Sequence, residues 1–82
     1  MSNITESKFF HICYNTIQTI KPDLEAIESE QNIEIGHEAV ADYALPNIEN
    51  YGNGSDEIMD EWRELNYARQ LEIIEEVSRE CF

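Results

Sequence analysis

Acidic side chains recur four residues apart near the end of this 82-residue sequence. Residues at that spacing are neighbours on a helix, so like charges are predicted to stand in columns along the helix surface. Five such pairs occur, and they are Asp56–Asp60, Asp60–Glu64, Glu57–Glu61, Glu72–Glu76 and Glu76–Glu80. Each pair costs roughly 0.2–0.5 kcal/mol at low salt, so the pattern gives up about 1–2 kcal/mol of stability. The clear favourable pair at this spacing in these acidic segments is Glu75–Arg79.

These columns have two interpretations. They could be a solvated face of an acidic protein, or they could be a binding surface for cations or basic side chains. Only Asp56 and Glu57 have a structural reason, because first-turn acids are favoured by the helix dipole. Carboxylates one turn apart lie roughly 5–6 Å apart along the axis, so two columns can imitate the anions that a basic groove binds. The predicted partner-binding residues are Asp56, Glu57, Asp60, Glu61, Glu64, Tyr67, Glu72, Glu76 and Glu80.

Metal chemistry is weakly represented. Glu34 and His37 have the E-x-x-H spacing of di-iron bundles, but such a site needs two of these motifs and two further carboxylates on facing helices. The other histidine, His11, follows Lys8 rather than an acid at the required spacing. The sequence therefore predicts no metal site and no cofactor.

Catalytic chemistry is no better supported. Cys13 and His11 are two residues apart and would face different sides of a helix, whereas an activated thiol needs a base within reach. Gly52-x-Gly54 lacks the lysine and the preceding strand of a phosphate-binding loop. We therefore expect a protein that is not an enzyme and has no catalytic residues.

The overall charge limits the choice of partner. Eighteen acids face five bases, which gives a net charge of −13 and a pI near 4.2. Such a field disfavours direct contact with nucleic acid and with anionic membranes, and it favours basic surfaces or simply solubility. No apolar run approaches a membrane span and no signal peptide is evident, so we expect a cytoplasmic protein. Cys13 and Cys81 are then expected to be free, half-buried thiols, with a disulfide as the alternative.

The apolar periodicity defines the elements that position these residues. The first half of the chain predicts helices over residues 6–20 and 22–30, or one helix kinked at Pro22, with Phe10 and Cys13 on its buried stripe. Residues 31–36 are predicted to be a linker. A short helix follows over residues 37–44 with Val40, Tyr43 and Ala44 inward.

The last third of the chain begins at the turn before Ser55, which is a good N-cap. The apolar stripe of the next helix is Ile58, Met59, Trp62 and Leu65. It then slips by one residue, to Ala68, Leu71, Ile74, Val77 (or Ser78) and Cys81. The slip predicts a break near Asn66, which could cap a last helix over residues 67–80, although one long helix with a rotating face remains an alternative. The result is an all-α fold, a compact bundle of four to five short helices, in one domain over residues 1–82.

In size, helical content and charge the chain resembles a class of small acidic DNA-mimic inhibitors of phages and mobile elements, of the anti-restriction and anti-CRISPR type. The resemblance implies a non-enzymatic inhibitor that binds a basic, nucleic-acid-binding surface of a protein. The alternative is a helical interaction or self-assembly module, in which charge serves solubility and an apolar patch forms a homodimer. For that alternative Phe9 is the useful residue, with Phe10 and Phe82 also near the termini.

Overall fold

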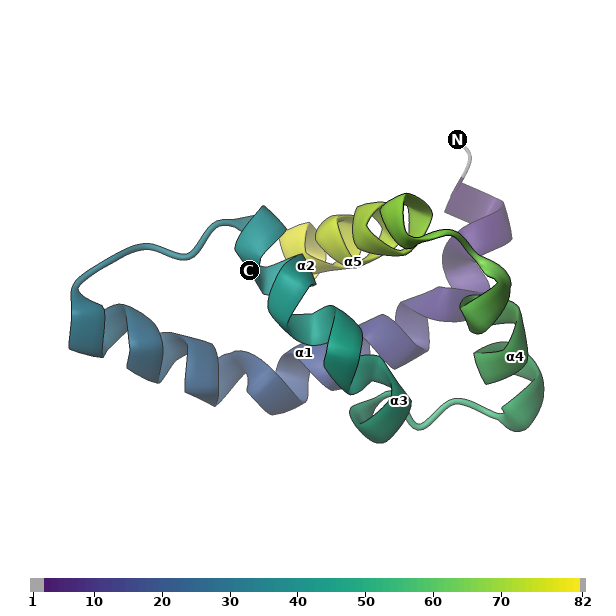
Figure 1. The fold of residues 1–82 in the computed structure, drawn as a ribbon, viewed down its shortest axis with the longest axis horizontal. Coiled ribbons are helices and arrows are strands. Elements are labelled where there is room, and N and C mark those ends of the chain that lie inside the picture. The colour runs from purple at the N-terminus through teal and green to yellow at the C-terminus, as the bar shows by residue number, and fades with distance from the viewer. Residues whose placement is uncertain (1–2, 82) are drawn as a thin grey trace.

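The computed structural model describes the backbone of residues 3–81 and the side chains of residues 8–81. Within that range the chain is all-α, with five α-helices and one 3₁₀ turn (Figure 1). The elements are α1 (Asn3–Gln31), α2 (His37–Ala44), the 3₁₀ turn η1 (Leu45–Asn47), α3 (Ile48–Tyr51), α4 (Asp56–Glu64) and α5 (Tyr67–Cys81). The predicted fold class is confirmed.

Helix α1 is continuous through Pro22, so the prediction of two separate helices is wrong and the single-helix alternative holds. The proline removes the N–H that would bond the carbonyl of Gln18. Both residues are exposed, so the carbonyl faces solvent and can bind water instead. A proline is therefore tolerated on the outer face of this helix.

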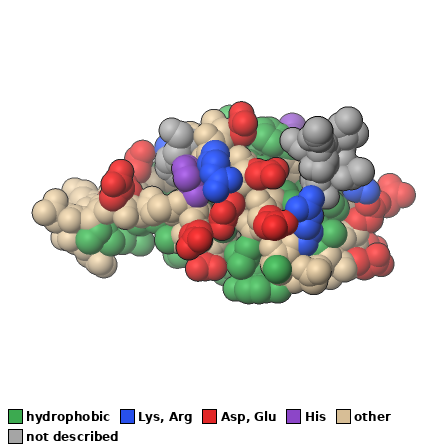
Figure 2. All heavy atoms as spheres, turned by 90° about the horizontal axis from the view of Figure 1, so that it is seen from above, with side chains coloured by type: hydrophobic (Ala, Val, Ile, Leu, Met, Phe, Trp, Pro, Cys, Tyr) green, Lys and Arg blue, Asp and Glu red, His purple; other side chains and the backbone are tan. Residues whose placement is uncertain are grey.

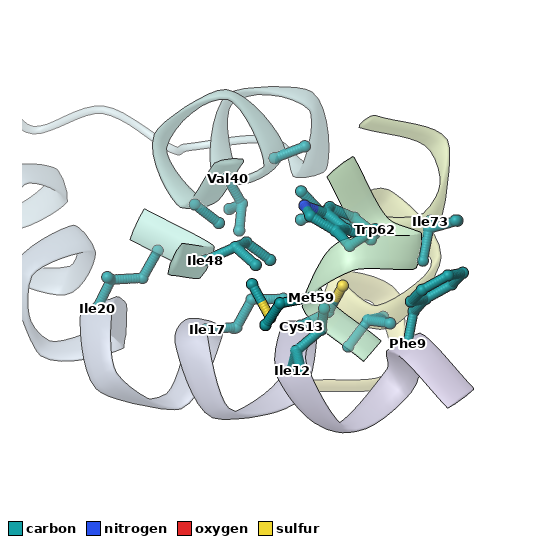
Figure 3. Packing of buried hydrophobic residues seen from close by; sticks show 14 of the residues in the cluster. Phe9, Ile12, Cys13, Ile17, Ile20, Val40, Ile48, Met59, Trp62 and Ile73 are labelled. Carbon is teal, nitrogen blue, oxygen red and sulfur yellow. The ribbon is translucent and has the colours of Figure 1, made fainter. Parts of the chain in front are cut away.

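The core forms where α1, α2 and α5 pack together, with α3 and α4 closing one end (Figures 1 and 3). Phe9 lies edge-on to Trp62, with ring centroids 5.4 Å apart, and both side chains are buried. Deep burial of aromatic rings contributes strongly to the stability of a small domain. The other buried apolar residues are Ile12, Cys13, Ile17, Ile20, Leu24, Val40, Ala41, Ala44, Ile48, Met59, Ile73, Ile74 and Val77.

The helix ends follow ordinary capping chemistry. Asn32 has φ 55°, and the N–H of Ile33 bonds the carbonyl of Glu28 at 3.1 Å, which ends α1 in a Schellman-type turn. Ser55 Oγ accepts a hydrogen bond from the N–H of Ile58 at 3.3 Å and caps α4. Asn66 Oδ1 accepts one from the N–H of Arg69 at 2.8 Å, so the predicted break between two helices is confirmed.

Several predicted burials are wrong. Phe10 is 39% exposed, because the buried face of α1 runs through its neighbour Phe9. Tyr43 points outward while Ala41 is buried, because α2 packs closely against α5 and a small residue fits that contact. On α5, Ala68 is exposed and Ile73 is buried, since this helix packs against both α1 and α2 and needs a wider apolar face.

Candidate functional site

The nine predicted partner-binding residues all reach the surface. Eight are exposed, including Tyr67 at 62%, and Glu61 is half-buried. The buried Met59 and Trp62 fix the orientation of α4, so its acids face outward. On α5 the buried residues Ile73, Ile74, Val77 and Ser78 do the same for Glu72, Glu76 and Glu80.

Arg63 ties α4 to α3. Its guanidinium donates hydrogen bonds from Nη2 to Glu49 Oε1 at 2.7 Å and from Nε to Glu49 Oε2 at 3.1 Å. Its Nη1 donates to Asp60 Oδ1 at 2.8 Å. The hydrogen bonds and charge of Glu49, together with the charge of Asp60, raise the pKa of Arg63 further above its ordinary value. Asp60, predicted to be an acid without a structural role, therefore has an ion-pair partner in Arg63.

Glu61 also has a partner. Lys8 Nζ, on α1, forms an ion pair with Glu61 Oε1, and its ammonium group lies 5.5 Å from the centre of the Phe9 ring. The two charged residues are 53 positions apart in the chain. An ion pair this exposed contributes about 0.2–1 kcal/mol. It is enough to offset the like-charge cost of the Glu57–Glu61 pair.

Two arginines lie among the four acids of α5. Arg69 Nη1 donates a hydrogen bond to Glu72 Oε1 at 2.6 Å. Arg79 Nη2 donates one to Glu75 Oε1 at 3.4 Å, so the pair predicted from its four-residue spacing is present. The face over α5 accordingly shows red and blue side chains next to one another rather than an unbroken acidic surface (Figure 2). The α5 column of acids is thus partly neutralised.

Three predicted acids stand apart from this pairing. Glu64, Glu76 and Glu80 are exposed, and within the described part of the chain no ion pair engages them. Asp56 and Glu57 lie in the first turn of α4, where the helix dipole stabilises them. The exposed carboxylates available to a partner are therefore those of residues 56–57 and 64 on α4 and of residues 76 and 80 on α5, and the exposed ring of Tyr67 lies at the start of α5.

The alternative chemistries receive no geometric support from the described residues. Glu34 lies in the linker while His37 opens α2, and His37 Nδ1 is 2.6 Å from Ser78 Oγ. Over the described residues, no group of three or more His, Cys, Asp or Glu side chains is placed to hold a metal ion. Nor does any described helix combine the length and apolarity needed to cross a membrane.

Both cysteines are free thiols. Cys13 is fully buried rather than half-buried, and desolvation, with a smaller contribution from the charge of Cys81, raises its pKa to about 12. Cys81 is half-buried, and its pKa is also raised by desolvation. A thiol with a raised pKa carries little thiolate at neutral pH, which makes both groups poor nucleophiles.

The ion pairs that were not predicted from the sequence are of two kinds. Asp60–Arg63 and Arg69–Glu72 are three residues apart, a spacing at which helical side chains also meet, so they could have been counted. The Arg63–Glu49 and Lys8–Glu61 pairs join different helices, and periodicity within one helix carries no information about them.

Comparison with known proteins adds no relative. No protein-family model, curated protein or solved structure matches this chain.

Proposed function

We propose that this protein is a non-enzymatic inhibitor that binds a basic, nucleic-acid-binding surface of another protein through the exposed carboxylates of α4 and α5. The observation that carries the proposal is the set of exposed acids outside the ion pairs of the described chain, Glu64, Glu76 and Glu80. Each of these acids faces a like charge four residues away, and among the described residues no ion pair offsets it, so a basic partner offers them a favourable contact.

The net charge supports the same conclusion. A field from −13 charges accelerates encounter with a basic surface and repels nucleic acid itself, so the proposed partner is a protein. The paired acids Asp60, Glu61 and Glu72 can take part as well, because exposed ion pairs are weak and exchange readily. We place this action in the cytoplasm, where free thiols such as Cys13 and Cys81 persist.

We infer the mode of inhibition from the spacing of the acids along α4 and α5. Carboxylates spaced along two helices can occupy the positions of phosphates in a basic groove, which is how we expect the protein to act as a DNA mimic. The class-level resemblance to small phage inhibitors of the anti-CRISPR and anti-restriction type is consistent with this mode. Tyr67, 62% exposed at the start of α5, supplies the apolar contact that a purely ionic interface lacks.

The test uses DNA-binding proteins as the probe. Proteins retained on DNA-cellulose are passed over the immobilised wild-type protein, over Glu64→Lys/Glu76→Lys, and over Glu38→Lys/Asp42→Lys. The last variant changes the net charge equally at two exposed residues of α2. We expect retention by the wild type and the α2 variant and loss with Glu64→Lys/Glu76→Lys. Equal retention by all three proteins, or by none of them, contradicts the proposal.

A second candidate function is self-association through an apolar patch, and one observation favours it. Phe10 and Tyr14 stack on the outside of α1 with ring centroids 5.7 Å apart, and they are 39% and 41% exposed. Phe9, the residue that the sequence offered for this role, is buried against Trp62 and cannot serve it. Phe82 lies outside the described residues.

A further inference from the structure

A pocket is lined by residues of α1, of the linker after it and of the start of α2. The linker between these two helices lies at the opposite end of the molecule from α4 (Figure 1). The volume of the pocket is about 450 Å³, which falls within the usual range of sites for small ligands. The residues that line it are Leu24, Glu25, Glu28, Glu34, Ile35, Gly36, His37 and Val40.

The lining combines apolar and acidic groups. Leu24 and Val40 belong to the buried core, and Ile35 packs against it, so this part of the pocket is hydrocarbon. Glu25 and Glu34 are exposed at the pocket, and Glu28 is half-buried. A ligand that fits both parts has an apolar stem and a cationic head.

Hydrogen bonds hold the pocket in shape. Glu28 accepts the N–H of Ile33 with its backbone carbonyl at 3.1 Å and the N–H of Ile35 with its carboxylate at 2.8 Å. On the other wall, His37 Nδ1 lies 2.6 Å from the hydroxyl oxygen of the buried Ser78. These contacts attach the linker to α1 and attach the start of α2 to α5. The pocket is therefore largely formed before a ligand binds, and binding costs little conformational entropy.

We propose that this pocket binds an arginine side chain of a basic partner protein. The three methylenes of arginine fit over Leu24, Ile35 and Val40, and the guanidinium faces the carboxylates. Arginine suits the pocket better than lysine, because its planar head is less strongly hydrated and can bond two carboxylate oxygens at once. The inference rests on the proposed function for the basic character of the partner, and it adds a contact remote from α4.

The experiment is an NMR titration of the ¹⁵N-labelled full chain with N-acetyl-arginine-N-methylamide as the probe. We expect saturable amide shifts at Gly36, His37 and Val40. The matched citrulline amide, which has the same shape without the charge, should give at least about threefold weaker binding. Equal shifts from both compounds, or arginine-dependent shifts confined to α4 and α5, overturn the proposal.

Paired variants separate this pocket from the net charge. Glu25→Gln/Glu34→Gln should weaken binding of the arginine probe about three- to tenfold, because each exposed ion pair is worth only a fraction of the binding free energy. Glu57→Gln/Glu64→Gln removes the same charge from α4 and should leave the pocket shifts unchanged. Equal weakening by both pairs contradicts a pocket-specific site. The probe needs no natural partner, so this site and the proposed function can fail independently.

Discussion

The ring of Phe9 packs edge-on against the indole of Trp62, with their planes inclined at 63°. This contact joins the start of α1 to the buried side of α4, and it determines which side of each helix is left for solvent. Turning α1 by one residue would bring Phe10 to this position and bury charged or polar neighbours with it. The acidic face of α4 is therefore exposed as a consequence of core packing.

Two neighbouring phenylalanines should differ sharply in their effect on stability. Phe9→Ala should lower the free energy of unfolding by about 3–5 kcal/mol, because it empties a buried site against Trp62. Phe10→Ala should lower it by about 1 kcal/mol or less, since that ring is 39% exposed. Urea unfolding followed by circular dichroism measures both. Similar values for the two variants would show that α1 is rotated from the orientation described.

Two glycines should respond differently to a methyl group. A Cβ on Gly52 would lie 2.7 Å from the carbonyl oxygen of Ile48 and 2.9 Å from Cβ of Ile12, so Gly52→Ala should cost about 1–3 kcal/mol. Gly36 has nothing within 4 Å of that position and has φ −79°, so Gly36→Ala should stay within about 0.5 kcal/mol of wild type. The thermal midpoints of the two variants provide the comparison. A destabilised Gly36→Ala with an unaffected Gly52→Ala would refute the close contact of the turn with α1.

Burial of Cys13 predicts a specific dependence of stability on pH. Its thiol has a pKa of about 12 in the folded protein, raised from an ordinary value of 9.0, so the unfolded chain loses this proton first as the pH rises. The stabilising contribution is complete below about pH 9 and is lost progressively up to about pH 12. Urea unfolding at several pH values above 8 should show a decline that is shallower in Cys13→Ala. An identical decline in wild type and variant would mean that Cys13 is not buried as described.

The second candidate function makes a prediction about assembly. If Phe10 and Tyr14 form a contact between copies, wild-type protein at high concentration should show a dimer mass by light scattering, and Phe10→Ser/Tyr14→Ser should be monomeric. Tyr43→Ser/Tyr51→Ser, at two other exposed rings, serves as the control and should remain dimeric. A monomeric wild-type protein removes this candidate and leaves the proposed inhibitor function in place.

Local chemistry made much of the fold predictable. The bounds of α2 and the separation of α4 from α5 follow from signals within a few residues, such as the caps at Ser55 and Asn66. The buried face of α1 could not be predicted from neighbouring residues. Phe9 and Phe10 both continue an apolar series along the helix, and the choice between them is made by Trp62, 53 positions from Phe9.

The candidate site was also predictable only in part, where its features depend on residues close together in the sequence. The acids on α4 are exposed because the opposite side of the helix carries the apolar stripe that includes Met59 and Trp62. This stripe can be read from the sequence, so the exposure of the acids was predictable. Which acids are neutralised depends on Lys8 and Glu49, which reach α4 from other helices. Because Asp60 and Glu61 are paired, Glu64 is the acid of the three that is left for a partner. The pocket beside the linker could not be predicted from any local pattern in the sequence.

The central claim is that the carboxylates of α4 and α5 occupy a site made for nucleic acid, and competition by duplex DNA tests it most directly. The DNA-binding proteins retained by the immobilised wild-type protein are eluted with increasing duplex DNA, and in parallel with poly-glutamate at equal charge. We predict release by duplex DNA at a much lower charge concentration than by poly-glutamate. Release by both polyanions at the same charge concentration, or retention in saturating duplex DNA, would contradict the claim.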